Sequence, residues 1–376
     1  MPSHPAPSTQ PNRIVYMDTL RAFLMILGVF YHAALIYRLR ADNLWRINSP
    51  ETHIAFNYFA ELVHSFRMPA FFIIAGFFAA MLISKYGVSV FARNRYVRLG
   101  VPLLFLGLAI NPFMALSSAN VAMSPLSLTY WLSGEWLAHL WFLQNLIIYT
   151  VIIFLIYKLY PRIEQHIEWM ELNYGWLLGI FAVWGLLSLT THMPGWGFVY
   201  DDKAIVRYFP FFAFGLVCFK NKLVARNFIR RRLNYLMVFS FLLASVTLRE
   251  YAFWHYVEGP LLSIHGLACA GVLIQVFQSL SGLYNQTIRD ISDASYTIYL
   301  LHQPLIVWFG YLIVGIEINI FLEYLILTIF TCLFCFFFHH GLVKKVPLIA
   351  FLFNGKPIKS AQGSPIPHQA HSTARM

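Results

Sequence analysis

Long apolar stretches recur along this chain of 376 residues, and each is long enough to cross a bilayer. A helix rises about 1.5 Å per residue, so about 20 apolar residues span the hydrocarbon core. The runs are continuous and lack polar alternation, which indicates helices rather than barrel strands. The sequence therefore predicts an all-α, polytopic integral membrane protein with about ten transmembrane helices around a polar cavity. The expected spans are 17–38, 54–84, 100–117, 138–158, 174–191, 204–220, 233–249, 260–281, 295–313 and 319–341.

The composition and the distribution of charge agree with a lipid environment. Hydrophobic residues make up 59% of the chain and charged residues 11%. The net charge of +11 does not indicate a nucleic-acid partner, because the basic residues do not form one patch with interleaved aromatic residues. With a cytoplasmic N-terminus, 19 of the 27 Lys and Arg residues lie in inner loops and tails, six in outer loops and two within the membrane. This bias predicts that both termini are cytoplasmic.

The two ends of the chain differ from its apolar middle. Residues 1–13 are rich in proline and serine and are expected to form a disordered cytoplasmic tail. Residues 14–345 are expected to form one transmembrane domain, followed by a cytoplasmic C-terminal segment at 346–376. Within that segment, 346–357 is expected to lie along the inner membrane surface.

Charged and titratable side chains inside an apolar span cost free energy unless they are paired or hydrated, so each indicates a cavity. In the first span, Arg21 and His32 are 11 residues apart, which places them on one face and about 16 Å apart in depth. Asp18 is three residues before Arg21 and is expected to pair with it. The plainer interpretations are an interfacial snorkelling arginine and a histidine hydrogen-bonded to a neighbouring helix.

The second span carries Glu61, His64 and Arg67 at spacings of three residues, which places them on one helix face. Pro69 follows directly and is expected to interrupt the helix, because proline lacks a backbone N–H. A broken helix is tolerated in a membrane where protein or water satisfies the freed backbone groups. The plainer interpretation is an ion pair that stabilises a kink.

The run FARNRYVRLGVP follows that span and holds Arg93, Arg95 and Arg98 without a nearby acid. Three arginines in this arrangement are suited to bidentate contacts with phosphates. The plainer interpretation is an anchor that contacts lipid headgroups.

Other polar groups occur near the ends of later spans. His302 lies about 12 Å into the ninth span, and His139 and Trp141 lie at an outer end. Cys332 and Cys335 form a CxxC without a second pair, so no metal site is expected there.

Several ordered motifs resemble a known family, the membrane acyltransferase-three family, over essentially the whole chain. They are an arginine and a histidine 11 residues apart in the first span, FARNRYVRLGVP, HLWFL and YTIYLLHQP. Within this family, the chain is most similar to the glucan biosynthesis protein C branch, which succinylates osmoregulated periplasmic glucans. The stretches that carry this similarity are RAFLMILGVFYHAALIY, HSFRMPAFFIIAGFF and PLIAFLFNGKP. The resemblance implies a multi-pass protein of the bacterial inner membrane. It further implies cytoplasmic acyl-CoA, specifically succinyl-CoA, as the donor substrate, and a periplasmic glucan as the acceptor.

Residues and resemblance together suggest a transfer route through the membrane. Membrane lipid and glucan synthesis or export proteins are the expected partners, with no nucleic acid, no metal and no permanently bound cofactor. His32 is the expected general base, because an imidazole titrates near neutral pH. The other expected roles are acyl-CoA binding by Arg93, Arg95 and Arg98; catalysis by Arg21, Asp18, His64 and His302; and substrate binding by Arg67, Glu61, His139 and Trp141.

Other functions remain compatible with the residues alone. Acetyl could replace succinyl, with another envelope polysaccharide as acceptor, and a covalent acyl-histidine could replace direct transfer. A secondary transporter or flippase would use the histidines as a proton relay, although no internal repeat is evident. A non-catalytic subunit of a glucan export complex is the third alternative.

Overall fold

The computed structural model describes residues 14–39, 45–118, 124–190, 202–248 and 254–356, and in these ranges the regular structure is helical throughout. The predicted disordered tail and residues 357–376 of the predicted C-terminal segment lie outside the described residues. The elements are α1 (Val15–Ala34), η1 (Leu35–Tyr37), α2 (Ile54–Tyr86), α3 (Val88–Arg95), η2 (Tyr96–Gly100), α4 (Val101–Phe105), η3 (Leu106–Ile110), α5 (Asn111–Leu116), α6 (Leu128–Leu132), η4 (Glu135–Leu140), α7 (Trp141–Leu159), α8 (Ile163–Trp169), α9 (Tyr174–Thr190), α10 (Asp202–Lys220), α11 (Lys222–Ile229), α12 (Leu233–Thr247), α13 (Trp254–Ser279), η5 (Leu280–Leu283), α14 (Gln286–Ile313), α15 (Ile320–Phe338), η6 (His339–Val343) and α16 (Pro347–Asn354).

Within the described residues, six helical segments are long and apolar enough to cross a membrane, or seven if the bent pair α10 and α11 counts as one span. The predicted number of ten is therefore not confirmed, although each expected span coincides with a helix. Helices α9 and α12 have apolar segments of fewer than 18 residues. In α14, the polar sequence His302-Gln303-Pro304 lowers the hydropathy of its apolar half. The six segments are Val15–Tyr37, Ile54–Tyr86, Val88–Leu116, Leu128–Leu159, Val257–Leu283 and Ile320–Val343.

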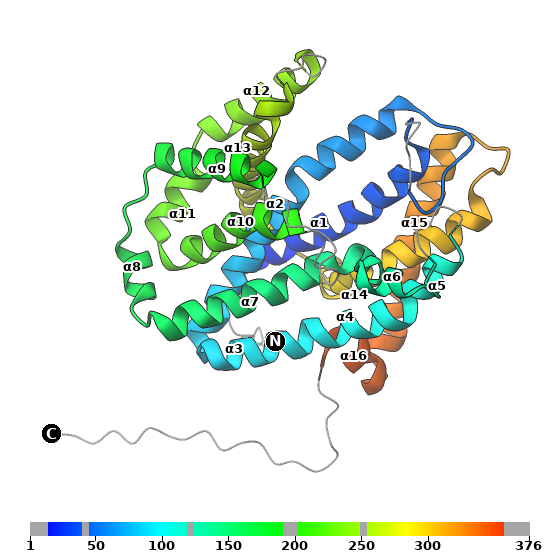
Figure 1. Cartoon of the computed structure of the whole chain (residues 1–376), viewed down its shortest axis with the longest axis horizontal. Coiled ribbons are helices and arrows are strands. Elements are labelled where there is room, and N and C mark those ends of the chain that lie inside the picture. Colours follow the sequence, from blue (N-terminus) through cyan, green and yellow to red (C-terminus); the bar gives the residue numbers. More distant parts are fainter. Residues whose placement is uncertain (1–13, 40–44, 119–123, 191–201, 249–253, 357–376) are drawn as a thin grey trace, which may run out of the picture.

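Helix α1 lies at the centre of the molecule, where it packs against α2, α13, α14 and α15 (Figure 1). Its buried side chains include Leu20, Leu24 and Val29, which fill the space between these neighbours. The small residues Gly28, Ala33 and Ala34 are also buried and allow close approach of other helices. Helix α1 thereby places Asp18, Arg21 and His32 among its neighbouring helices.

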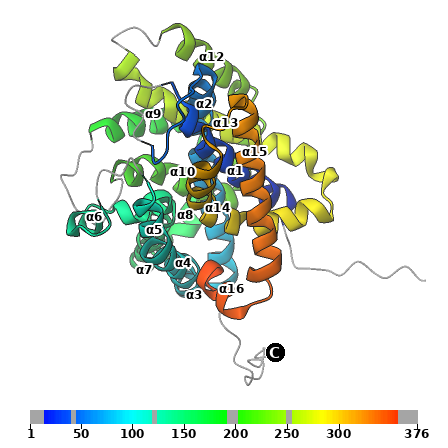
Figure 2. The same ribbon diagram turned by 90° about the vertical axis from the view of Figure 1, so that its right-hand side faces the viewer.

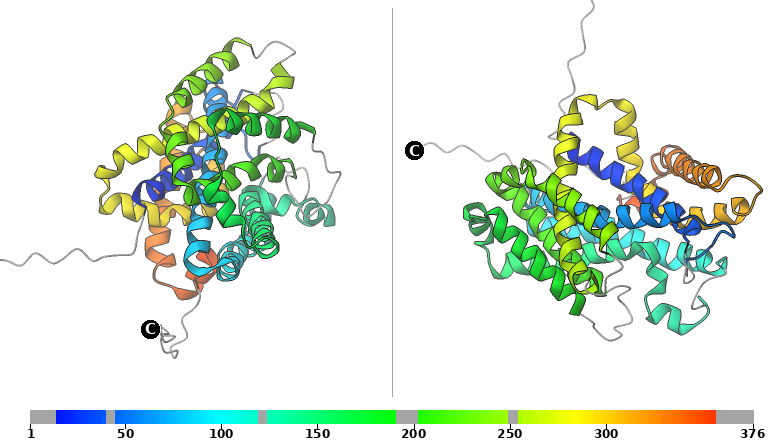
Figure 3. Two further views of the ribbon diagram at one scale, coloured as in Figure 1. Left: turned by 90° about the vertical axis from the view of Figure 1, so that its left-hand side faces the viewer. Right: turned by 90° about the horizontal axis from the view of Figure 1, so that it is seen from above.

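Helices far apart in the sequence lie on opposite sides of α1 (Figure 3). Helices α9 to α12 lie on one side and α15 on the other, as seen from above in Figure 3. The first group is joined to the centre by α10, which crosses α2 with backbone nearly touching backbone: a Cβ on Gly76 would lie 1.9 Å from the carbonyl oxygen of Phe212. Larger residues at this crossing would force the two helices apart.

Helix α2 runs without interruption from Ile54 to Tyr86, so the expected break at Pro69 is wrong. The Pro69 ring packs against α13 at Gly266, where an added Cβ would lie 2.6 Å from the ring. Proline removes one helical hydrogen bond, and the glycine opposite leaves room for its ring. The helix is therefore accommodated by its neighbour rather than broken.

Two ends of the bundle are defined by the contacts between its segments. At one end, the Tyr296 hydroxyl donates to the Arg98 carbonyl at 3.0 Å, and Lys344 pairs with Asp293 at 3.8 Å. We call this the basic end; α16 lies there beside α4 (Figure 2). At the other end, the far end, the amide N–H of Ser49 donates to the Ile36 carbonyl at 3.0 Å.

Candidate active site

Three histidines from distant parts of the sequence meet beside the last turn of α1. The ring centroid of His32 lies 5.0 Å from that of His302 on α14, which lies 5.3 Å from that of His139 in η4. His139 and His302 are almost fully buried. His32, His139 and His302, here called the histidine cluster, were all predicted as site residues, and the fold brings them together.

Backbone carbonyls determine which ring nitrogen carries the proton in two of these histidines. His302 donates from Nδ1 to the Tyr299 carbonyl at 2.6 Å, and His139 donates from Nε2 to the Leu300 carbonyl at 3.0 Å. The other nitrogens, His302 Nε2 and His139 Nδ1, therefore present lone pairs. Both of these atoms, and His32 Nδ1, are buried without a hydrogen-bond partner in the described part of the chain. Such groups are costly unless a ligand or water pairs with them, so the cluster is suited to accept protons from a bound hydroxyl.

A kink positions His139. The preceding residue, Ala138, has φ 44° and ψ −122°, and it is the one described non-glycine residue with positive φ. This conformation costs about 1–3 kcal/mol and is held by its surroundings. One contact that holds this segment comes from the Tyr299 hydroxyl, which donates to the His139 carbonyl at 2.9 Å.

Arg67 reaches the histidine cluster through Tyr31. Its guanidinium carbon lies 4.8 Å from the Tyr31 ring centroid, and that ring lies 4.9 Å from His32. Gly28 makes room for it, because an added Cβ there would lie 2.2 Å from Arg67 Nη1. Arg67 is buried and its Nε has no partner among the described residues. A buried arginine here supplies positive charge next to the proton-accepting groups.

His64 also contacts Tyr31. The two rings are stacked with centroids 5.9 Å apart, and the Tyr31 hydroxyl is 3.5 Å from His64 Nδ1. The His64 side chain is exposed, in contrast to Arg67, and Glu61 lies nearer the start of the same helix. These two residues therefore lie at the edge of the site.

A cavity of about 710 Å³ enters the bundle from the basic end. Its rim carries basic residues from four segments, and its walls are apolar, with Met25, Phe71 and Phe142 among them. The cavity thus combines a cationic opening with an apolar interior. The basic residues are Arg21, Arg95, Arg98, Lys344 and Lys356.

The predicted arginine group is divided by the structure. Arg95 and Arg98 line the cavity, whereas Arg93 is exposed and does not. The run follows the second span as expected, and it also forms the start of the next apolar segment, Val88–Leu116, with Arg98 in a π-helical turn. The predicted pair of Asp18 and Arg21 is confirmed at 3.3 Å, and it lies at the cavity rather than in the histidine cluster.

Aromatic rings separate the cavity from the histidines. Met25 lies seven residues before His32, about 10 Å along α1. The Phe142 ring on the cavity wall lies 5.9 Å from the Tyr299 ring, which is 6.0 Å from His302. None of the three histidines lines the cavity as it stands. Trp141, a predicted substrate residue, instead stacks on Tyr208 at 5.8 Å and belongs to the apolar packing.

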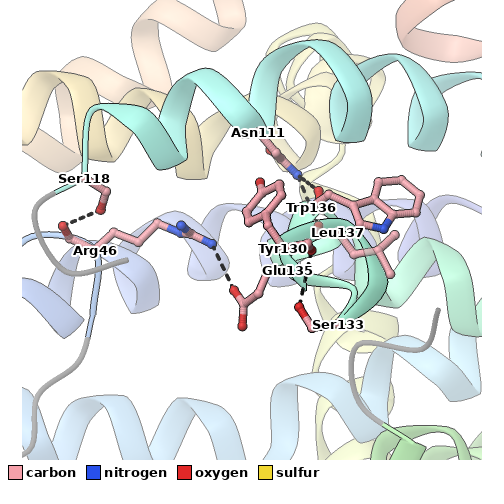
Figure 4. Close-up of polar contacts among 8 residues, drawn as sticks. All are labelled: Arg46, Asn111, Ser118, Tyr130, Ser133, Glu135, Trp136 and Leu137. Carbon is pink, nitrogen blue, oxygen red and sulfur yellow. Dashed lines mark hydrogen bonds and ion pairs between the residues drawn. The ribbon is translucent and has the colours of Figure 1, made fainter. Parts of the chain in front are cut away.

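Residues that the sequence did not single out lie beyond the cluster, toward the far end. The Trp45 ring stacks on His32 at 6.4 Å, and Arg46 reaches Glu135 at 3.9 Å (Figure 4). Tyr130 and Asn111 lie beside this pair in Figure 4, and the Tyr130 hydroxyl and Asn111 Oδ1 are buried without a described partner. The sequence gives only a positional signal for these residues. Trp45 and Arg46 lie in the connection after the first span, and Glu135 lies four residues before His139.

Comparison with known proteins places this arrangement in a family. A family model described as an acyltransferase domain, Acyl_transf_3, matches residues 14–340. The chain belongs to the acyltransferase-3 family. Glucans biosynthesis protein C of Escherichia coli strain K12 is 27% identical to it over 388 residues, covering 94% of this chain and 98% of that protein. The protein of the same name from Escherichia coli O1:K1 / APEC is 28% identical over 389 residues. No solved structure matches the chain.

As a member of the acyltransferase-3 family with several apolar spanning helices, the protein is a multi-pass membrane acyltransferase. The matched region includes the three histidines and the arginines of the cavity. In the described ranges, no three His, Cys, Asp or Glu side chains are arranged to hold a metal ion. Among the predicted site residues of this acyltransferase, His32, His139 and His302 form the histidine cluster, and Arg21, Arg95 and Arg98 line the cavity.

Proposed function

We propose that this protein is a transmembrane O-acyltransferase that moves a succinyl group from succinyl-CoA to hydroxyl groups of a periplasmic glucan. The observation that carries the proposal is the histidine cluster, with its unpaired proton-accepting nitrogens, situated between a basic, apolar-walled cavity and a polar group of residues at the far end. The similarity to the glucans biosynthesis proteins C supports the choice of acceptor.

The positive-inside bias supports placing the basic end in the cytoplasm of the bacterial inner membrane. In that orientation, Arg95 and Arg98 meet the phosphates of a cytoplasmic acyl-CoA, because guanidinium groups bind phosphate with charge-assisted, often bidentate hydrogen bonds. The apolar walls suit the uncharged pantetheine arm. Arg21, held by Asp18, lies along the same route.

The reaction needs a base, because a sugar hydroxyl is a poor nucleophile until its proton is removed. We assign His32 as that base. The hydroxyl oxygen attacks the thioester carbon, His32 takes the proton, a C–O ester bond forms and the C–S bond breaks. The proton then returns to the departing thiolate, which gives free CoA. His302, with its Nε2 lone pair and its ring 5.0 Å from His32, is placed to share the proton.

Arg67 accounts for the choice of a dicarboxylic acyl group. Its guanidinium is buried next to Tyr31 and Gly28, and a buried cation is most stable when an anion pairs with it. The free carboxylate of a succinyl group supplies such an anion, and an acetyl group does not. The route of the acceptor runs from the far end past Trp45, whose ring provides an apolar face of the kind that sugars contact.

The full-length protein in liposomes, supplied with succinyl-CoA and purified periplasmic glucan, tests this function directly. We expect release of free CoA and a glucan mass increase of one succinyl group per transfer. His32→Ala should lower the rate about 10²- to 10⁴-fold, the range that general base catalysis provides. His166→Ala is the matched control, because His166 is exposed and contacts Tyr160 outside the site.

Each alternative function gives a different result in the same experiment. A transporter would move glucan or anion without consuming acyl-CoA. Transfer from acetyl-CoA but not from succinyl-CoA would replace the donor. An inserted, stable His32→Ala protein with full activity would remove the histidine cluster from the mechanism.

A further inference from the structure

The C-terminal helix α16 is part of the cavity. Its side chain Phe353 packs between Phe105 and Phe338, with ring centroids 5.5 and 5.3 Å away, which fixes the helix against α4 and the end of α15. Figure 2 shows α16 beside α4 at the basic end. The segment is therefore docked onto the bundle, and two of its residues, Asn354 and Lys356, line the cavity.

Gly355 makes this docking close enough for backbone to meet backbone. It ends α16 with φ +58°, a conformation that favours glycine. An added Cβ would lie 2.5 Å from the Arg98 Cα and 2.5 Å from the Val97 carbonyl oxygen. The contact brings Asn354 and Lys356 next to the segment that carries Arg95 and Arg98.

Two polar atoms in this corner of the cavity lack partners. Asn354 Oδ1 and Ser292 Oγ are buried without a hydrogen bond in the described part of the chain, and both residues line the cavity. An amide oxygen accepts a hydrogen bond, so Asn354 calls for a donor such as an amine or a hydroxyl. Lys356, two residues after Asn354, adds a cation to the wall of the same cavity. The corner thus offers both neutral hydrogen bonds and positive charge.

We propose that Asn354 and Lys356, with Ser292, form the subsite for the nucleotide end of the donor. Asn354 and Ser292 hydrogen-bond the base or the ribose, and Lys356 binds the phosphate on that ribose. Gly355 is the positioning residue that holds the pair against Arg98. The inference rests on the proposed function for the identity of the donor and assigns a different part of it from the pyrophosphate that Arg95 and Arg98 meet.

The position of these groups favours a nucleotide over a lipid headgroup. A phosphatidylglycerol headgroup also carries a phosphate and hydroxyl donors, so the location of Asn354 and not its chemistry makes the distinction. The position of Asn354 on the cavity wall, rather than on the outer surface of the bundle, agrees with an elongated ligand that enters the cavity.

Binding to the purified full-length protein tests the subsite without any transfer reaction. The probes are CoA and 4′-phosphopantetheine, which lacks the nucleotide. Lys356→Ala and Asn354→Ala should each weaken CoA binding about tenfold, as expected for the loss of one charge-assisted or buried hydrogen bond. Binding of 4′-phosphopantetheine should stay unchanged, and Lys356→Arg should retain most of the CoA affinity.

Lys345→Ala is the matched control, because Lys345 is exposed on the neighbouring segment and does not line the cavity. It should bind both probes as the unchanged protein does. Thermal unfolding of each variant identifies a fold defect, which would weaken both probes equally and would count against the subsite.

The outcomes separate this inference from the proposed function. If the unchanged protein binds CoA and the two variants bind it equally well, the nucleotide subsite is excluded and the donor assignment stands. If the unchanged protein binds no CoA, the donor assignment itself fails. If the variants instead lose bound phosphatidylglycerol, detected by native mass spectrometry, with no change in CoA affinity, the corner binds lipid and the inference is overturned.

Discussion

The ring of Phe142 meets the ring of Tyr299 nearly edge-on, with centroids 5.9 Å apart. Phe142 lines the cavity, and the Tyr299 carbonyl accepts the hydrogen bond that orients His302. One aromatic contact therefore separates the cavity from the proton-accepting groups. A thioester that reaches His32 from the basic end passes this contact, so movement of these two rings is part of the proposed reaction.

Replacing Phe142 by Ala should open the cavity toward the histidines. We expect a loss of about 3–5 kcal/mol in the free energy of unfolding, the usual cost of removing a buried phenyl ring. The folded variant should hydrolyse succinyl-CoA in the absence of acceptor faster than the unchanged protein does, because water reaches the histidine cluster more easily. Phe154→Ala is the control, because Phe154 lies twelve residues further along the same helix and does not line the cavity. An unchanged hydrolysis rate would show that the ring is not a barrier.

Gly28→Ala should displace the guanidinium of Arg67, because the new methyl group would lie 2.2 Å from Nη1. Overpacking of this kind costs about 1–3 kcal/mol in stability. The KM for succinyl-CoA should rise more than the KM for acetyl-CoA, since the displaced cation no longer meets the free carboxylate. Steady-state kinetics with both donors measures the ratio, and an equal rise for both would argue against carboxylate binding by Arg67.

The arginines of the basic end differ in their contact with the cavity, which provides an internal control. Arg95→Ala and Arg98→Ala should each raise the KM for the donor about tenfold with little change in kcat. Arg93→Ala should leave both parameters unchanged, because its exposed side chain does not line the cavity. The opposite ranking would mean that the donor phosphates bind outside the cavity.

Trp45→Ala should affect the acceptor and not the donor. Its ring stacks on His32 from the far end, so its removal should raise the KM for glucan severalfold and leave the KM for succinyl-CoA unchanged. Trp169→Ala is suitable as the comparison, because Trp169 is 84% exposed on α8. A change in donor KM alone would place the acceptor route elsewhere.

Orientation in the membrane is testable with single cysteines at exposed positions, since the four native cysteines are buried or half-buried. A cysteine at Glu51, near the far end, should react in intact cells with a reagent that does not cross the inner membrane. A cysteine at Lys345, at the basic end, should react after the membrane is made permeable. The reverse pattern would contradict transfer from the cytoplasm outward.

The residues of α1 could be predicted because a charge or an imidazole in an apolar helix is conspicuous. Arg21 and His32 are of this kind, and so is His302. The division between cavity and histidine cluster could not be predicted, since Phe142 and Tyr299 look like any other aromatic residues in an apolar span. The position of His139 depends on the unusual backbone of Ala138, for which alanine carries no sequence signal.

Three other features were hard to predict, because each depends on a property of the folded chain that the sequence alone does not show. Trp45 and Arg46 lie in the connection between the first two spans, and the sequence gives no sign that the Trp45 ring stacks on His32. Pro69 indicated a break because the sequence shows the missing N–H but not the facing Gly266 that accommodates the ring. The ten expected spans were counted by length, whereas α9 and α12 have apolar segments that are shorter than a full crossing.

The cavity opens at the basic end, and the Phe142 ring on its wall contacts Tyr299, the neighbour of His302. In the proposed reaction, spent CoA leaves through the entrance by which it came before a fresh donor enters. Added free CoA should therefore compete with succinyl-CoA while leaving the glucan's own access unaffected.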